Sequence, residues 1–230
     1  MQIRWYGQSA YTVRGGKTVA IDPFGAIGER FASRGIVFAY PPIEGVEADV
    51  LLITHDHLDH NAVDVVGGSP VVLRTPGTHE SPVGPVVGVA SEHDDAAGTT
   101  RGPNTIFRFS LDGVTLCHLG DFGQSALRPE QVRAIGEIDV LFVPAGGGPT
   151  VGGESAAEVV RVLRPRLVVP MHYRTEGATF LDPPDAFFDA LGAPVERLPE
   201  SMFEAELLLG TRDEPIVAVP AAPVSATVGR

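Results

Sequence analysis

Cysteine is almost absent from this chain of 230 residues, which has Cys117 alone. One thiol cannot form a disulfide within the chain, so a disulfide-stabilised scaffold is excluded. A zinc site built from cysteines is excluded as well, because such a site needs two or more thiolates. The fold must therefore be stabilised by a hydrophobic core, and any metal site must use histidine and carboxylate ligands.

Positive charge is also scarce, because 17 basic residues face 29 acidic ones and the formal net charge is −12. Such an excess of negative charge repels nucleic acids and anionic membranes at long range. We therefore expect a small-molecule substrate, with neither nucleic acid nor a membrane among the partners. The sequence leaves the oligomeric state open.

Long hydrophobic runs are missing too, and none reaches the length of a membrane span. The segment Met1–Gly7 has the pattern of a strand rather than the apolar core of a signal peptide, which predicts a cytoplasmic protein. Apolar residues make up 43% of the chain and charged residues 20%, as in a globular domain with a sizeable core. We expect a single domain over residues 1–220 and a loosely held tail over residues 221–230.

The chain begins with short strands and then alternates strands with helices. Three strands over residues 2–6, 10–14 and 18–22 predict a meander, and a loop rich in Gly and Pro follows over residues 25–48. Further strands are expected near 50–53, 70–74, 85–90, 105–110, 113–119, 139–143, 166–170, 195–198 and 204–209, and helices at 60–66, 129–135, 154–163 and 183–191. This order predicts an α/β (α+β) fold of two stacked sheets with helices on both outer faces, a four-layer αββα sandwich.

The densest chemical signal is the segment Thr54–His60, which reads Thr-His-Asp-His-Leu-Asp-His and follows a predicted buried strand. Of the 7 histidines in the chain, three lie in this segment. His55 and His57 are two residues apart, so in an extended segment their side chains point to the same side and can bind one metal ion. Asp59 and His60 lie beyond the strand and can reach a second ion. Imidazole and carboxylate ligands suit zinc, manganese or iron.

Three more residues with ligand chemistry follow predicted strands in the same way: His93, Asp121 and His172. Strand ends at one edge of a sheet meet in one crevice, where α/β enzymes often place their sites. A single histidine after a strand is more often structural than a ligand, but three such residues together with the dense cluster indicate a shared metal site. By contrast, we expect His118 and Asp22 to form structural hydrogen bonds rather than to bind metal.

The whole pattern is His-x-His-x-Asp-His, then a distant His, a Gly-Asp pair and a late His, and it resembles the ligand set of the metallo-β-lactamase superfamily. The resemblance is closest to a branch of metal-dependent hydrolases that contains the L-ascorbate-6-phosphate lactonases. The motifs that carry it are the N-terminal strand, Asp22-Pro23-Phe24, Arg101-Gly102-x-Asn104, His118-Leu119-Gly120-Asp121 and Pro170-Met171-His172-Tyr173.

This resemblance implies the metallo-β-lactamase fold and two divalent metal ions, with zinc or manganese expected and iron or nickel as further candidates. The ligand set that it implies is His55, His57 and His93 for one ion, Asp59, His60 and His172 for the other, and Asp121 as the bridge. One position departs from the branch, because many members carry a Gly-His pair near the first strand where this chain has Gly7-Gln8. We expect Gln8 to hydrogen-bond the substrate or a metal ligand instead.

Two neighbouring ions can share a water molecule and lower its pKa toward neutrality. The expected reaction is therefore the hydrolysis of a small anionic ester, a phosphodiester or a lactone, by a metal-bridging hydroxide. Asp59 and Asp121 are the expected catalytic carboxylates, because Asp121 fixes the spacing of the ions and Asp59 orients the hydroxide or takes its proton. Arg101, Asn104 and Tyr173 are candidate substrate contacts, although each fits a structural role equally well.

Other activities on the same fold remain as alternatives. Flavodiiron proteins resemble this architecture but carry Glu where His57 stands, and the best-known class of β-lactamases uses a late Cys ligand that this chain lacks. A nuclease needs a basic surface or an extra domain for RNA, and the chain offers neither. A mononuclear iron dioxygenase is not separated from a hydrolase by these motifs.

Overall fold

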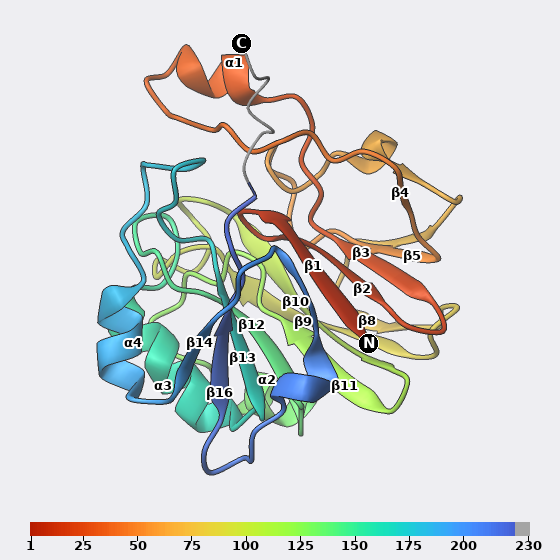
Figure 1. Ribbon diagram of the computed structural model, residues 1–230, viewed down its shortest axis with the longest axis vertical. Coiled ribbons are helices and arrows are strands. Elements are labelled where there is room, and N and C mark those ends of the chain that lie inside the picture. Colours follow the sequence, from red (N-terminus) through yellow and green to blue (C-terminus); the bar gives the residue numbers. More distant parts are fainter. Residues whose placement is uncertain (224–230) are drawn as a thin grey trace.

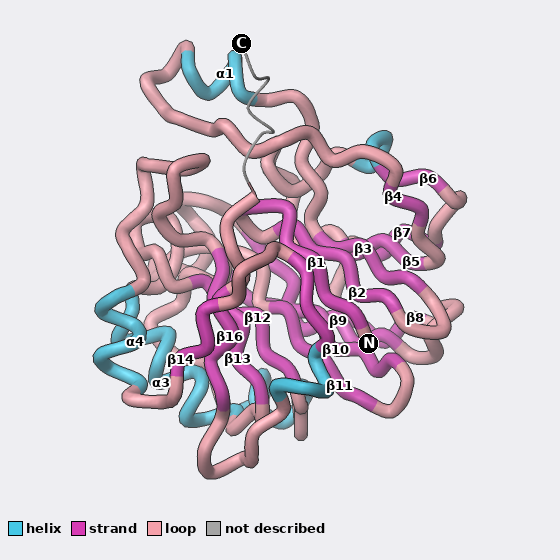
Figure 2. Tube along the Cα trace, viewed as in Figure 1, coloured by secondary structure: helices cyan, strands magenta, loops and turns pink. Residues whose placement is uncertain are grey.

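The computed structural model describes residues 1–223, which form two β-sheets stacked face to face (Figures 1 and 2). The first sheet has six strands in the order β15-β1-β2-β3-β5-β7. These strands are β1 (Gln2–Gly7), β2 (Ala10–Arg14), β3 (Thr18–Ile21), β5 (Val50–Leu52), β7 (Val71–Leu73) and β15 (Met202–Glu204). The predicted antiparallel meander is formed by β1, β2 and β3, and β5 and β7 continue the sheet in parallel.

The second sheet has eight strands in the order β14-β16-β13-β12-β11-β10-β9-β8. Its strands are β8 (Gly77–His79), β9 (Val86–Glu92), β10 (Pro103–Leu111), β11 (Val114–His118), β12 (Val140–Pro144), β13 (Leu167–Met171), β14 (Val195–Arg197) and β16 (Ile216–Val219). From β8 to β11 the pairing is antiparallel, and from β11 through β14 it is parallel. A small separate sheet pairs β4 (Val46–Glu47) with β6 (Val66–Gly67).

The space between the two sheets holds the main hydrophobic core. In β5, Val50 and Leu52 belong to this core, whereas Leu51 belongs to a second cluster on the other face of the sheet. Side chains of a strand alternate between its two faces, so a continuous apolar run is what a strand buried on both faces requires. The second sheet contributes large side chains such as Phe107 and Phe109, which are fully buried.

Helices cover the outer face of the second sheet, as predicted (Figure 1). These are α2 (Pro129–Ile135), which contacts β9, and α3 (Gly153–Leu163), which contacts both β12 and α4 (Asp185–Leu191). The apolar side of α3, with Ala156, Val159 and Val160, is buried, and its opposite side is exposed. The predictions for all three helices are confirmed to within two residues.

The outer face of the first sheet is covered by a loop, so the fourth layer of the predicted sandwich is not helical. Between β3 and β4 the described chain contains one short helix, α1 (Gly28–Ala32). Phe24, Phe38, Tyr40 and Ile43 from this loop bury the outward face of the sheet. The segment is rich in Gly and Pro, which disfavour a long helix, so apolar loop side chains form the layer instead.

Two predicted elements are wrong, and the strands β4, β6, β8 and β16 are missed. The helix expected at 60–66 is a turn of 3₁₀ helix (Val63–Val65) followed by β6, because the chain there pairs with β4. The strand expected at 204–209 ends at Glu204, and a 3₁₀ helix (Ala205–Leu208) follows. The longest of the missed strands, β16, lies between β13 and β14.

Two further sequence predictions concern the ends of the chain and the membrane. Of the tail predicted over 221–230, residues 224–230 lie outside the described part of the chain. Within the described part, every helix is too short or too polar to cross a bilayer.

Candidate metal centre

The candidate metal centre lies where strands of both sheets end. His55 and His57 come just after β5 in the first sheet, and His93 comes directly after β9 in the second. Asp121 follows β11, and His172 follows β13 directly. The structure therefore brings together residues that are more than a hundred positions apart in the sequence, as the strand-end argument predicts.

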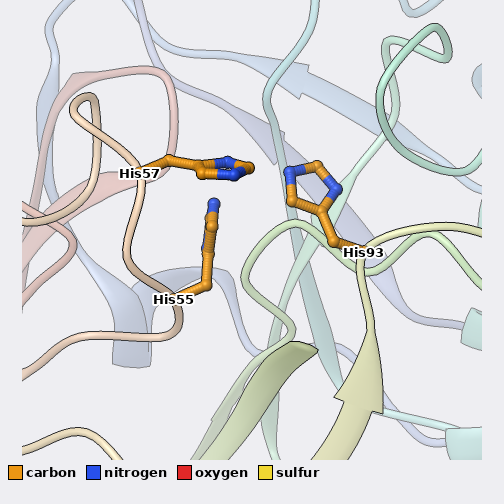
Figure 3. A group of neighbouring side chains, drawn as sticks. All are labelled: His55, His57 and His93. Carbon is orange, nitrogen blue, oxygen red and sulfur yellow. The ribbon is translucent and has the colours of Figure 1, made fainter. Parts of the chain in front are cut away.

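One group of possible ligands consists of His55, His57 and His93. One nitrogen from each ring lies within 4.8 Å of the others. Figure 3 shows the three rings converging on one point, His55 and His57 from one loop and His93 from the opposite sheet. Three imidazoles at this spacing can surround a single ion.

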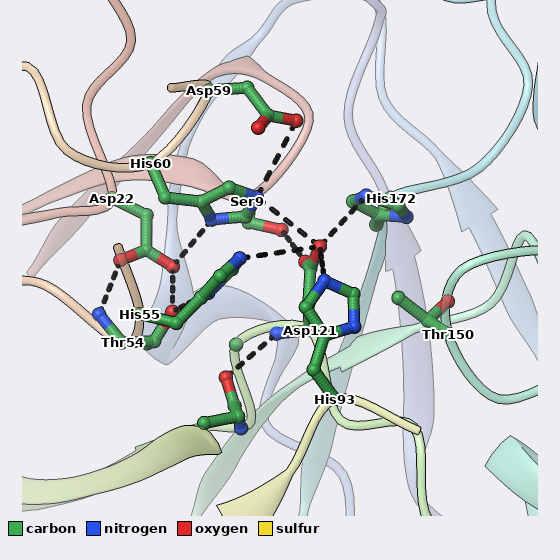
Figure 4. A network of polar contacts seen from close by, with 12 residues as sticks. Ser9, Asp22, Thr54, His55, Asp59, His60, His93, Asp121, Thr150 and His172 are labelled. Atoms are coloured by element: carbon green, nitrogen blue, oxygen red, sulfur yellow. Dashed lines mark hydrogen bonds and ion pairs between the residues drawn. The ribbon is translucent and has the colours of Figure 1, made fainter. Parts of the chain in front are cut away.

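A second group consists of Asp59, His60 and His172, whose ligand atoms also lie within 4.8 Å of one another. Asp121 lies between the two groups (Figure 4). Its Oδ2 is 3.2 Å from His93 Nε2, 3.2 Å from His172 Nε2 and 3.3 Å from His60 Nε2. One carboxylate oxygen thus faces ligands of both groups, which is the position of a bridging ligand.

The polar atoms at the centre fit metal ions better than they fit a closed protein interior. His55 Nε2 and His60 Nε2 are buried and have no hydrogen-bond partner among the described residues. Leaving a buried polar atom unsatisfied costs about 1–3 kcal/mol. Five imidazoles and two carboxylates aimed at one space would be costly without a cation, and this donor set suits zinc, manganese or iron.

The pKa values of the histidines at the centre also indicate that its carboxylates favour a neighbouring positive charge. Burial lowers the pKa of His55 and His57, so both stay neutral, as metal ligands must. Burial also acts to lower the pKa of His60, but the carboxylates of Asp121 and Asp59 outweigh it and raise this pKa well above its ordinary value. These carboxylates therefore call for a cation next to them, which a proton or a metal ion can supply.

Asp22 orients one histidine of each group. Its Oδ2 accepts hydrogen bonds from His60 Nδ1 at 3.0 Å and from Thr54 Oγ1 at 2.6 Å. Since the Thr54 hydroxyl donates to Asp22, it accepts from His55 Nδ1 at 3.0 Å. Both rings then carry their proton on Nδ1 and present Nε2 to the centre. Asp22 is itself within ligand distance of His55 and His60, but these hydrogen bonds occupy its carboxylate, as the prediction of a structural role requires.

The loop that carries Asp121 is fixed by buried side chains. Asn104 Oδ1 accepts a hydrogen bond from the Asp121 amide at 3.1 Å, and Ser9 Oγ donates to Asp121 Oδ1 at 3.2 Å. Gly120 has a φ of +58°, and a Cβ there would lie 2.4 Å from Asn104 Oδ1, so this position requires glycine. His118 bonds the Ser9 carbonyl and the Gly120 amide, in agreement with its predicted structural role.

The four predicted substrate contacts have different surroundings. Gln8 is buried and donates to Asp59 Oδ2 at 3.4 Å, and Arg101 lines the cavity above the centre. The amide of Asn104 donates to Ser91 Oγ and to the Leu119 carbonyl and accepts from the Asp121 amide, so these contacts favour the structural role that the sequence left open. The Tyr173 ring lies 5.5 Å from that of Trp5 and borders a separate hollow, which favours a packing role.

A cavity of about 650 Å³ opens above the centre. His57, Asp59, His93, Asp121 and His172 line its inner part. The rest of its lining is formed by Phe31, Arg34, Ile36, Asp56, Leu58, Arg101 and Phe180, together with Gly148 and Pro149. Phe31 and Arg34 were indicated only by the unusual length of the loop 25–48, and no sequence pattern indicated Phe180.

Comparison with known proteins agrees with this geometry. Residues 2–172 match a family model for the β-lactamase superfamily domain. A UPF0173 metal-dependent hydrolase of Thermococcus kodakarensis is 33% identical over 210 residues, which cover 80% of this chain and 89% of the relative. A UPF0173 metal-dependent hydrolase of Pyrobaculum arsenaticum is 33% identical over 209 residues, with the same coverage of 80% and 89%.

Solved structures show the same fold. A Thermotoga maritima protein, described as a Zn-dependent hydrolase of the metallo-β-lactamase superfamily, is 33% identical with a TM-score of 0.75, over 95% of this chain and 98% of that one. A Parabacteroides distasonis protein described as a metal-dependent hydrolase is 17% identical with a TM-score of 0.62, over 96% and 92%. The second likeness bears on the fold alone.

Proposed function

This chain belongs to the β-lactamase superfamily as a metal-dependent hydrolase, and from that premise we propose that it binds two divalent ions and hydrolyses a small anionic ester. Zinc or manganese is the proposed ion, and a phosphodiester or a lactone is the proposed substrate. The substrate is a free small molecule in this proposal, and no nucleic acid or membrane takes part.

The observation that carries the proposal is the position of Asp121 between two groups of three ligands. Its Oδ2 lies 3.2 Å from a histidine of one group and 3.2 Å from a histidine of the other. A mononuclear site would use one group and leave the other buried without a partner, which favours two ions over the alternative of a mononuclear iron dioxygenase. Bound divalent ions would supply Lewis acidity and hydroxide at neutral pH.

Asp59 is the residue best placed to handle a proton. Its side chain is 14% exposed, lines the cavity, and lies 3.7 Å from His60 Nε2. The Gln8 amide donates to Asp59 Oδ2 at 3.4 Å, which fixes the plane of the carboxylate. In this account Gln8 orients Asp59, and Asp59 accepts a proton from the attacking water and returns it to the leaving group.

The size and charge of the cavity support a small anionic substrate. A volume of about 650 Å³ falls in the range of small-molecule sites. Arg101 is exposed at the cavity and suits a phosphate or carboxylate group. A polynucleotide would meet the repulsion of a chain with a net charge of −12 along its whole length, whereas a small ligand meets mainly the local field.

A direct competition tests the proposal. The metal-loaded protein is assayed on a nitrophenyl phosphodiester, a sugar-phosphate lactone and single-stranded RNA. We expect kcat/KM to be highest for one of the two small substrates. If RNA gives much the highest kcat/KM, or if none of the three is hydrolysed by protein that contains metal, the proposed substrate class is wrong.

A further inference from the structure

The outer part of the cavity is built from four loop segments and combines apolar with cationic side chains. Phe31, Arg34 and Ile36 come from the loop that covers the first sheet, and Phe180 comes from the loop after β13. Leu58 lies between the metal ligands His57 and Asp59, and Arg101 lies beyond His93. We call Phe31, Arg34, Ile36, Leu58, Arg101 and Phe180 the cavity rim.

Two apolar side chains of the rim are exposed to solvent. Leu58 is 41% exposed and Phe180 is 36% exposed, and both face the cavity. Exposed apolar side chains that gather around one concave site mark a place where a ligand removes them from water. Their position beside the metal centre makes an apolar group of the substrate the natural occupant.

The two arginines of the rim have guanidinium groups without a partner among residues 1–223. No hydrogen bond or ion pair joins the side chain of Arg34 or Arg101 to another described residue, although acidic residues outnumber basic ones in the chain. Both line the same cavity from different loops. A pair of unpaired guanidinium groups at the mouth of a site suits a carboxylate or phosphate group.

The loop that carries Arg101 is held in place by a single carboxylate. Asp94 accepts four backbone hydrogen bonds, from the amides of Ala96, Gly98, Thr100 and Arg101, at 2.7 to 3.0 Å. At the base of this loop the amide of His93 donates to the carbonyl of Gly102 at 3.1 Å. Arg101 therefore leaves a rigid loop whose position is tied to that of a metal ligand.

The other side of the rim is held as firmly. The Ala39 amide donates to the Gly177 carbonyl at 2.8 Å, and the hydroxyls of Tyr40 and Thr175 lie 2.7 Å apart. These contacts join the loop that carries Phe31 and Arg34 to the loop that carries Phe180. The apolar wall is thus preformed, and a ligand can use it without first ordering a loop.

We propose that the substrate is an amphiphilic anion, with an acidic group held by Arg34 and Arg101 and an apolar group packed against Phe31, Ile36, Leu58 and Phe180. This inference rests on the proposed function for the reaction, but the binding of such a molecule is measurable without turnover.

Calorimetric titration tests the rim with two probes that share one headgroup, phenylphosphonate and methylphosphonate. Burial of the phenyl ring predicts that the metal-loaded protein binds phenylphosphonate about tenfold or more tightly than methylphosphonate. Phe180→Ser should reduce this ratio to about threefold or less, and Phe31→Ser provides an independent test on the other loop. Leu207→Ser, which changes a side chain that is 83% exposed outside the cavity, should leave the ratio unchanged.

Separate variants test whether Arg34 and Arg101 bind the acidic group. Arg34→Gln and Arg101→Gln should each weaken both phosphonates about fivefold to tenfold, with the ratio between them kept and the metal content unchanged. Arg133→Gln on the exposed side of α2 is the matched control and should change neither affinity.

Several outcomes overturn the proposal. A ratio near one in the wild-type protein, or a ratio that neither Phe180→Ser nor Phe31→Ser lowers, shows that the rim does not select an apolar group. If Phe180→Ser instead dissociates an oligomer and leaves the ratio unchanged, the rim is a subunit interface. Failure of the proposed function is distinguishable. If the protein prefers phenylphosphonate as expected but hydrolyses no ester, the proposed reaction is wrong and the proposed binding role of the cavity rim is supported.

Discussion

Asp22 connects the two groups of proposed metal ligands, although it is assigned to neither. It follows β3 with a φ of +46°, and it bonds His60 directly and His55 through the hydroxyl of Thr54. A single carboxylate thereby sets the protonated nitrogen of one ring in each group. Residues that orient metal-binding histidines in this way contribute strongly to metal affinity.

Substitution of Asp22 should therefore weaken binding at both ions. In Asp22→Asn the amide nitrogen cannot accept from His60 Nδ1, and we expect metal affinity to fall about 10–100-fold. Thr54→Val should affect only the group that contains His55. Competition with a chelator measures both affinities, and circular dichroism checks the fold. Wild-type affinity in Asp22→Asn would show that the hydrogen bonds do not orient the rings.

Asp94 predicts a dependence of stability on pH. Its hydrogen bonds, first of all that from the Arg101 amide, lower the pKa of the carboxyl below its ordinary value of 3.8. A carboxyl whose pKa is lower in the folded state stabilises the fold fully above its unfolded pKa and loses this contribution as the pH falls through its folded pKa. Asp94→Asn should thus lower the free energy of unfolding at pH 7, and the difference from wild type should shrink below pH 3.8.

Urea unfolding of the metal-free protein at a series of pH values measures this difference without the influence of bound ions. Asp95→Asn is the matched control, because Asp95 is exposed and accepts no side-chain hydrogen bond from the described residues. A difference that stays constant from pH 7 to below pH 3.8 would contradict the role given to the Asp94 carboxylate.

Single residues also show what the sequence can predict. The seven proposed ligands were predictable because each has ligand chemistry and follows a strand, and the strands bring them to one edge. Ser9, Arg34 and Phe180 were not predictable, because their position depends on tertiary packing: Ser9 reaches Asp121 from the turn between β1 and β2, and Arg34 and Phe180 come from two loops that meet at the cavity. The hydrogen bonds of Asn104 were not predictable either, since only the structure shows that its amide bonds Ser91, Leu119 and Asp121.

At the scale of elements, the contact between the loop that carries Phe31 and the loop that carries Phe180 depends on close packing around Tyr40. A Cβ at Gly177 would lie 2.7 Å from the Tyr40 ring, and one at Gly7 would lie 2.5 Å from it. No side chain fits at either place without a shift of the ring. The aromatic group Phe24, Phe38 and Tyr40, with ring centroids 5.0 to 5.9 Å apart, extends this packing over the first sheet.

Gly177→Ala should therefore push Tyr40 out of place and loosen the rim. Overpacking of this kind costs about 1–3 kcal/mol of stability. We expect a lower Tm and a smaller preference for phenylphosphonate over methylphosphonate. Gly25→Ala lies in the same covering loop and is the control, because its Cβ would meet Ala62 only at an ordinary 3.5 Å. Equal Tm values for the two variants would contradict the packing argument.

Elements differ in how well sequence patterns predict them. Buried strands and the helices of the second sheet have clear periodicity, and they were found. The strand β16 escaped notice because its Ile-Val-Ala-Val run stands between two prolines near the chain end and resembles a tail. The layer over the first sheet has no period at all, so its apolar side chains could not be assigned to a layer before the fold was known.

At the scale of the whole molecule, the net negative charge and the two arginines of the cavity have opposite effects on an anionic substrate. The chain has a net charge of −12, yet its cavity combines two arginines with a centre that attracts cations. Attraction of an anionic substrate therefore depends on the local field rather than on the net charge. The cytoplasmic location and the exclusion of nucleic acid as a partner stay predictions from the sequence.

The central claim is that two groups of ligands share Asp121 and hold two ions in one chain. The most direct measurement is the metal content of the purified full chain, by elemental analysis after saturation with zinc or manganese and removal of free ions. We predict close to two ions per chain in the wild-type protein and a clear loss in Asp121→Ala that is still folded. A folded wild-type chain that binds one ion or none would contradict the claim.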